Sequence, residues 1–244
     1  MVALALVLSV LIGVSLGLLG GGGSILTTPI LIYALGVEPK QAIATSLLVV
    51  CITSLSGMLQ HARKGNVAWR TGLVFGAAGM AGAYLGGLAA GWIPAGMLMG
   101  LFAAMMLITA VAMFRGRKDV TPGPEKPAWM TLLIGLLVGA VTGLVGAGGG
   151  FVVVPALVLL AGLPMQRAVG TSLLVIVMNT AAGYAGHASH VTVDFPLVGL
   201  MSTAAVFGSL VGSRLVSLVS PSALRRGFAG FVLVMAGFVL FQQM

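Results

Sequence analysis

The sequence predicts an all-α integral membrane protein built from two related halves. Hydrophobic residues make up 59% of the chain and charged residues only 7%, against about 25% in soluble domains. With a mean hydropathy of +1.16, no water-soluble fold could bury this much apolar surface. A glycine-rich, proline-ended stretch at residues 18–29 (LLGGGGSILTTP) returns at residues 144–155 (LVGAGGGFVVVP). Hydropathy therefore gives the class of fold, and the repeated stretch gives its internal duplication.

The duplication extends through most of the chain. At an offset of 126 residues, residues 44–48 (ATSLL) match residues 170–174 (GTSLL), and His61 matches His187. We therefore assign residues 1–114 to a first repeat and residues 128–244 to a second. The polar, proline-containing residues 115–127 are predicted to form a cytoplasmic linker between them.

Each repeat is expected to contain one broken helix followed by three spanning helices. Residues 1–37 carry no charge, yet they are too many for one straight helix across roughly 30 Å of hydrocarbon, so the glycines at 20–23 should break the helix. Pro29 and Pro155 are expected early in the second arms, where a missing N–H is tolerated. In the first repeat we expect a broken helix at 1–36 and spans at 41–60, 71–91 and 92–114. In the second we expect a broken helix at 128–161 and spans at 168–186, 195–213 and 221–241.

Basic residues indicate how the two repeats are oriented. If each broken helix crosses the membrane once, the repeats are parallel and the twelve Lys and Arg residues divide seven to five. If each is a re-entrant hairpin, the repeats are inverted and every Lys or Arg except Lys40 lies on one side. The positive-inside rule favours inverted repeats, with both termini outside the cytoplasm. Inverted repeats with interrupted helices are typical of secondary transporters, whose substrate sites lie between the repeats.

The glycine breaks are the first candidate binding elements. A glycine-rich break before a short helix presents free backbone N–H groups to an anion, and it could equally serve only close helix packing. Hydroxyls at or near the start of the spanning helix that follows each broken helix could hydrogen-bond the anion or bond back to their own helix. A buried asparagine needs a partner or a substrate. The candidate substrate-binding residues are Gly22, Gly23, Ser24, Thr45, Ser46, Gly148, Gly149, Gly150, Thr171, Ser172 and Asn179.

His61 and His187 are the titratable side chains that occur in both repeats. They fall at the ends of predicted spans, so they are either interfacial histidines or contacts for a substrate or proton. The three histidines and one cysteine show no metal-ligand spacing, and no P-loop is present, so we expect no metal, cofactor or enzymatic activity. The four carboxylates lie in predicted loops, whereas proton-coupled and cation pathways usually carry one within the membrane.

The paired glycine–proline motifs, the paired TSLL segments and the hydrophobic plan resemble the TauE/SafE family of sulfite exporters and sulfonate permeases. The resemblance covers nearly the whole chain and implies a bacterial inner-membrane transporter of small sulfur-containing anions such as sulfite, sulfoacetate or other organosulfonates. By this resemblance, the family's motif positions correspond to Gly20, Gly22, Gly23 and Pro29, to Gly146, Gly148, Gly149 and Pro155, and to the Thr-Ser pairs at 45–46 and 171–172.

Three functional hypotheses remain open on the sequence. The leading one is transport of a small anion by alternating access between the repeats. A passive anion channel or uniporter of the same fold, and a non-transporting membrane scaffold, are the alternatives. The expected partners are the anion and membrane lipid, with no nucleic acid, because the net charge of +8 is explained by basic cytoplasmic loops. Small residues around 76–87 would permit a homodimer.

Overall fold

A computed structural model shows a helical bundle, and the residues it describes contain no strand, which confirms the all-α class for them. They are residues 2–19, 24–114, 128–145, 150–159, 162–215 and 219–243. The first half contains α1 (Val2–Leu19), α2 (Ser24–Pro29), the π-helix η2 (Ile30–Ala34), α3 (Pro39–Arg63), α4 (Trp69–Ala90) and α5 (Ala95–Phe114). The second half contains α6 (Ala128–Val145), α7 (Gly150–Leu159), α8 (Met165–His187), α9 (Phe195–Leu215) and α10 (Pro221–Gln243).

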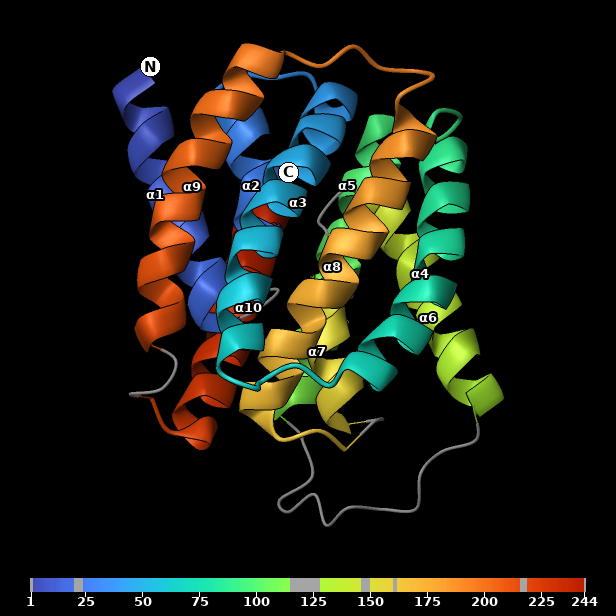
Figure 1. Cartoon of the computed structure of the whole chain (residues 1–244). Coiled ribbons are helices and arrows are strands. Elements are labelled where there is room, and N and C mark those ends of the chain that lie inside the picture. The colour runs from blue at the N-terminus through green and yellow to red at the C-terminus, as the bar shows by residue number, and fades with distance from the viewer. Residues whose placement is uncertain are drawn as a thin grey trace.

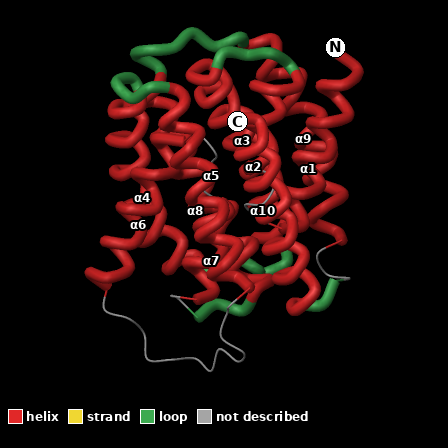
Figure 2. The backbone as a smooth tube through the Cα atoms, turned by 180° about the vertical axis from the view of Figure 1, so that it is seen from behind, coloured by secondary structure: helices red, strands yellow, loops and turns green. Residues whose placement is uncertain are grey.

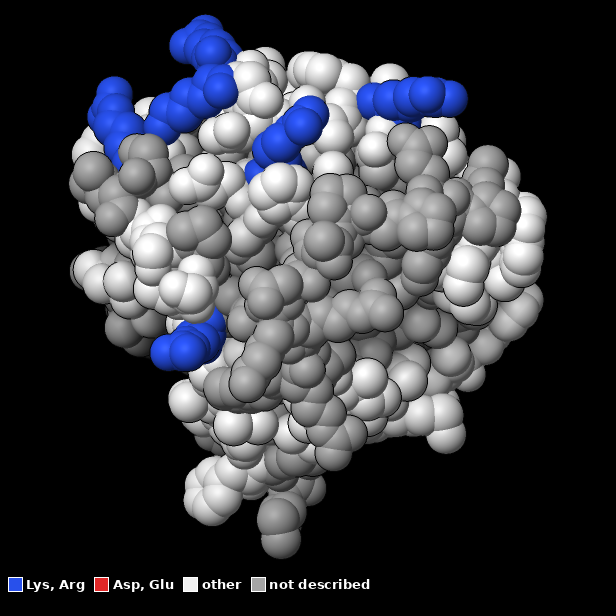
Figure 3. Space-filling view, turned by 90° about the horizontal axis from the view of Figure 1, so that it is seen from below, with Lys and Arg blue, Asp and Glu red and all other residues white. Residues whose placement is uncertain are grey.

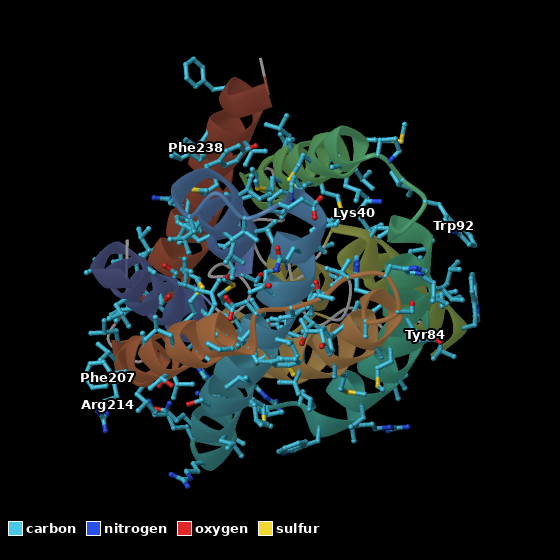
Figure 4. The ribbon with its side chains drawn as sticks, turned by 90° about the horizontal axis from the view of Figure 1, so that it is seen from above. Lys40, Tyr84, Trp92, Phe207, Arg214 and Phe238 are labelled. Carbon is cyan, nitrogen blue, oxygen red and sulfur yellow. The ribbon has the colours of Figure 1, made fainter. Side chains whose placement is uncertain are left out.

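Four of the described helices are long and apolar enough to cross a membrane: α3, α4, α8 and α9. Large apolar side chains remain on the outside of the bundle, among them Trp92 at 85% exposure and Phe207 at 64%. Seen from above, both lie at the periphery (Figure 4). An apolar exterior of this kind is the surface expected of a bundle that has lipid as its solvent.

The chain path brings each broken segment back to the end where it began. In Figure 1, α1 descends from the N-terminus at the upper end, and the arm formed by α2 and η2 returns upward. α6 rises from the lower end and α7 returns downward, and the view from behind agrees (Figure 2). α3 therefore starts at the upper end and α8 at the lower end, and the two pack against each other in opposite directions.

The halves exchange their helices rather than packing separately. α4 of the first half packs along α6 of the second, and α9 of the second packs along α1 of the first. Both approaches are close enough that a Cβ on Gly82 would collide with the Leu136 carbonyl oxygen, and one on Gly208 with that of Val10. These two contacts match at the offset of 126 residues. Small residues permit such close backbone approach between helices in membranes. The glycines within 76–87 are thus packed inside the bundle, and the expectation that they form an exposed face for a homodimer was wrong.

The prolines occupy positions other than those expected. Pro29 ends α2 and Pro155 lies inside α7, each five residues after the first residue of its helix. Both are thus beyond the first turn, and the expectation that they lie where a missing N–H is tolerated was wrong. After Pro29 the backbone widens into η2, in which the Leu35 N–H donates to the Ile30 carbonyl at 3.1 Å. The second arm of the first half is therefore a composite helix.

Basic side chains gather at the lower end of the bundle. Figure 3 shows Lys and Arg on this face, and Lys40 lies in the first turn of α3 at the opposite end (Figure 4). There the Lys40 Nζ donates to the Gly91 carbonyl at 2.8 Å, linking the start of α3 to the end of α4. The described basic residues in lower loops and helix ends are Arg63, Lys64, Arg70, Arg167, Arg214 and Arg226. Charge thus distinguishes the two ends of the bundle.

Candidate functional site

The second arms of the two broken segments meet inside the bundle. Ser24 begins α2 and Gly150 begins α7, both buried, and the helices α2 and α7 contact each other. Among the predicted anion-binding glycines, Gly22, Gly23, Gly148 and Gly149 lie outside the described residues. The structure therefore brings together the two arms that directly follow the glycine breaks, one from each half.

The first Thr-Ser pair lies beside the second arm of the first half. Thr28 on α2 donates its hydroxyl to the Ser46 Oγ at 3.0 Å, which joins the glycine–proline motif to the TSLL segment on α3. Ser46 donates in turn to the Ile43 carbonyl at 3.0 Å. Its neighbour Thr45 is 1% exposed, and its Oγ1 has no hydrogen-bond partner. Thr45 thus has hydrogen-bonding capacity that the described fold does not use.

The second Thr-Ser pair is bound into the backbone. The Thr171 hydroxyl donates to the Arg167 carbonyl at 2.6 Å and accepts from the Ala68 N–H at 2.9 Å. Ser172 donates to the Val169 carbonyl at 2.7 Å, the counterpart of the bond from Ser46. Thr171 therefore fixes the loop between α3 and α4 onto α8, and its hydroxyl has less capacity left for a ligand than that of Thr45.

Asn179 is the predicted site residue with the most unused capacity. It is 0% exposed on α8, and neither its Oδ1 nor its Nδ2 has a hydrogen-bond partner. Buried amide atoms are normally paired, since leaving one unpaired costs about 1–3 kcal/mol. An unpaired carboxamide in a membrane-spanning helix needs a functional explanation, such as a ligand or a bound water.

The two histidines are buried rather than interfacial. His61 is 0% exposed and His187 is 2% exposed. The His187 Nε2 lies 2.8 Å from the Gly143 carbonyl oxygen, and the His61 Nε2 lies 3.4 Å from that of Gly17. Because a carbonyl only accepts, Nε2 is the donor in each case. The two carbonyls belong to the last turns of α6 and α1, where helical carbonyls lack partners within the helix. Each histidine thus caps a first arm just before its glycine break.

Two residues near the site were not singled out from the sequence. Thr28 was missed, although the pair Thr27-Thr28 stands within the first motif, and the second motif has Val153 and Val154 there. Gly79 was missed because glycine is common throughout the chain. Comparing the halves position by position would have found it, since the residue that matches Gly79 is Ala205.

Comparison with known proteins shows which family the chain belongs to. The family model described as "Sulfite exporter TauE/SafE" matches residues 5–239. The chain belongs to the TauE/SafE family. A probable membrane transporter protein of Xylella fastidiosa is 34% identical, with 95% of this chain and 92% of the relative covered. Similar proteins with the same description occur in Methanocaldococcus jannaschii (29% identical, 97% and 96% covered) and Bacillus subtilis (26%, 88% and 90%). No solved structure matches the chain.

Membership in the TauE/SafE family makes the protein a multi-pass membrane protein and a probable membrane transporter, which agrees with its long apolar helices. The resemblance drawn from the twin motifs is thereby confirmed. The curated relatives are described as transporters, so this is a transport protein rather than an enzyme.

Proposed function

We propose that the protein carries a small sulfur-containing anion, such as sulfite, sulfoacetate or another organosulfonate, across the bacterial inner membrane by alternating access. The observation that carries this proposal is the contact between α2 and α7, the two arms that follow the glycine breaks. One arm comes from each half, so a ligand between them would touch both halves. Relative motion of the halves would then change its access from one side of the membrane to the other.

The two halves act in this proposal as inverted repeats. The opposite directions of the packed helices α3 and α8 support the inversion. Equivalent contacts support the duplication itself, because His61 faces Gly17 as His187 faces Gly143, each across 44 residues. The Cys51 thiol donates to the carbonyl of Val177, its own counterpart at the offset of 126, at 3.8 Å. A residue contacts its own counterpart only near the axis that relates two repeats. The axis would therefore pass between α3 and α8.

The basic lower end is proposed to face the cytoplasm. Positive residues are retained on the cytoplasmic side of membrane proteins, and the described Lys and Arg residues other than Lys40 gather at that end. The N-terminus, which lies at the upper end, would then be outside the cytoplasm, and we propose the same for the C-terminus.

The anion would be held mainly by uncharged groups. Backbone N–H groups at the starts of the second arms would donate to its oxygens, with Ser24 and Gly150 marking their described ends. Among the predicted site side chains that the structure describes, Thr45 and Asn179 have unused capacity, whereas Ser46, Thr171 and Ser172 shape the site from fixed positions. A cell that is negative inside drives anion export by about 2.3 kcal/mol per charge per 100 mV, so export needs no coupling ion.

Flux measurements in proteoliposomes test this function. Purified protein is reconstituted, and uptake of radiolabelled sulfite and sulfoacetate is measured with and without the same unlabelled anion on the opposite side. Saturable flux stimulated by the opposite anion supports a carrier. Flux that neither saturates nor responds indicates the channel alternative, and no flux of either anion contradicts the proposal. Gly23→Leu should abolish flux, and Gly199→Ala serves as the control because nothing lies within 4 Å of a Cβ there.

A further inference from the structure

Asn179 is held in a place that α4 provides for it. A Cβ on Gly79 of α4 would collide with the Asn179 Oδ1 and would lie 2.9 Å from its Nδ2. The other side of Gly79 is equally close to α6, because a Cβ on Gly139 would lie 2.6 Å from the Gly79 Cα. Gly79 therefore lies between the Asn179 amide and α6, and no space remains there for a side chain on residue 79.

The equivalent place on α9 is filled differently. Thr53 matches Asn179 and Ala205 matches Gly79 at the offset of 126. The geometry is the same, since a Cβ on Gly13 would collide with the Ala205 carbonyl oxygen just as one on Gly139 would with that of Gly79. Thr53, however, is satisfied, because its hydroxyl donates to the Val49 carbonyl at 2.7 Å.

The two residue pairs, Thr53 with Ala205 and Asn179 with Gly79, differ in hydrogen bonding rather than in the space they fill. One pair combines Thr53 of the first half with Ala205 of the second, and the other combines Asn179 of the second half with Gly79 of the first. Only the second pair leaves buried polar atoms unpaired. Packing alone would favour the threonine–alanine pair, because it avoids the cost of an unpaired amide. The asparagine–glycine pair therefore has a use that packing does not explain.

We propose that the Asn179 amide is the side-chain anchor of the transported oxyanion and that Gly79 is a specificity-determining residue that makes room for this amide. This inference rests on the proposed transport function. The Nδ2 group would donate to an oxygen of the anion, and as a neutral group it would hold the anion without trapping it by charge. The anchor is present in the second half alone, so the anion is bound off the axis that passes between Cys51 and Val177.

The double variant Gly79→Ala/Asn179→Thr tests the inference by replacing the asparagine–glycine pair with the threonine–alanine pair found at the matching positions. The probe is radiolabelled sulfite in proteoliposomes, and thermal unfolding in detergent reports on the fold. We expect the unfolding midpoint to stay at or above that of the wild type. The sulfite concentration for half-maximal flux should rise roughly 10- to 100-fold, as for the loss of a hydrogen bond to a charged group.

Two single variants separate the anchor from packing. Gly79→Ala alone should lower both stability and flux, because the new methyl group meets the amide. Ala205→Gly, the matched control on α9, should keep the flux of the wild type. Wild-type flux and half-saturation in the double variant would overturn this inference and leave the transport function standing. A wild-type protein that moves neither sulfite nor sulfoacetate would overturn both.

Discussion

The two halves of the bundle share their backbone contacts and differ in their polar ones. Gly82 against α6 and Gly208 against α1 are equivalent close approaches, and so are the bonds from His187 and His61 to the carbonyls of the first arms. These contacts occur at matching positions in both halves, and they hold together the scaffold that the two halves share.

The polar differences lie on α2 and α3 and on their counterparts α7 and α8. Thr45 has an unpaired hydroxyl where Thr171 makes two hydrogen bonds, and Asn179 has an unpaired amide where Thr53 is satisfied. Thr28 reaches Ser46 in the first half, whereas Val154 stands at the matching position in the second. In the proposed mechanism, a ligand between the halves would therefore meet two different surfaces.

The largest expected effect tests the shared scaffold. Gly82→Ala and Gly208→Ala should each lower the free energy of unfolding by about 1–3 kcal/mol or more, because the methyl group would meet backbone atoms that cannot move aside. Thermal unfolding in detergent measures the loss. Gly199→Ala, on the same helix as Gly208 but open to space, should unfold like the wild type. If Gly208→Ala and Gly199→Ala unfold alike, α1 and α9 are not in the close contact described here.

A second comparison sets the two threonines against each other. Thr171→Val removes the acceptor of the Ala68 N–H and should cost about 1–3 kcal/mol of stability. Thr45→Val removes a hydroxyl without a partner, so the unfolding midpoint should stay unchanged or rise while sulfite flux falls. Unfolding and flux are measured on the same preparations. Equal losses of stability in the two variants would show that the halves do not differ here.

The smallest effect concerns the histidine caps. His187→Phe should lose about 1 kcal/mol, and His61→Phe should lose less, because the bond from His61 is 3.4 Å long against 2.8 Å. Thermal unfolding again gives the difference. His187→Gln retains an N–H donor and should recover part of the stability. A greater loss in His61→Phe than in His187→Phe would reverse the proposed ranking of the two caps.

Much of the fold could be predicted from local sequence. Hydropathy gave an all-helical membrane protein, and the glycines at 20–23 and 146 and 148–150 separated the apolar stretches that became α1 and α2, and α6 and α7. Gly36 and Gly162, matched at the same offset, end the second arms with φ of +68° and +67°, where glycine is favoured. These features depend on residues close together in the chain, so they can be read without knowing which helices meet.

The candidate site could be predicted only in part. Residue type identified Asn179 as a buried polar group in need of a partner, but it could not show that its amide is unpaired or that Gly79 makes room for it. Nor could it show that Thr171 is bound by the loop before α4 while Thr45 is not. Hydrogen bonding of a helical side chain depends on which neighbour its face meets.

The sequence by itself therefore determined the class of fold, the duplication and the family, because each follows from local patterns of hydropathy and glycine. Only the tertiary structure decided that α4 packs on α6 and α1 on α9, and that α2 meets α7. Those pairings depend on how closely backbones approach across a distance of many residues. They place an unpaired asparagine in one half and a satisfied threonine in the other.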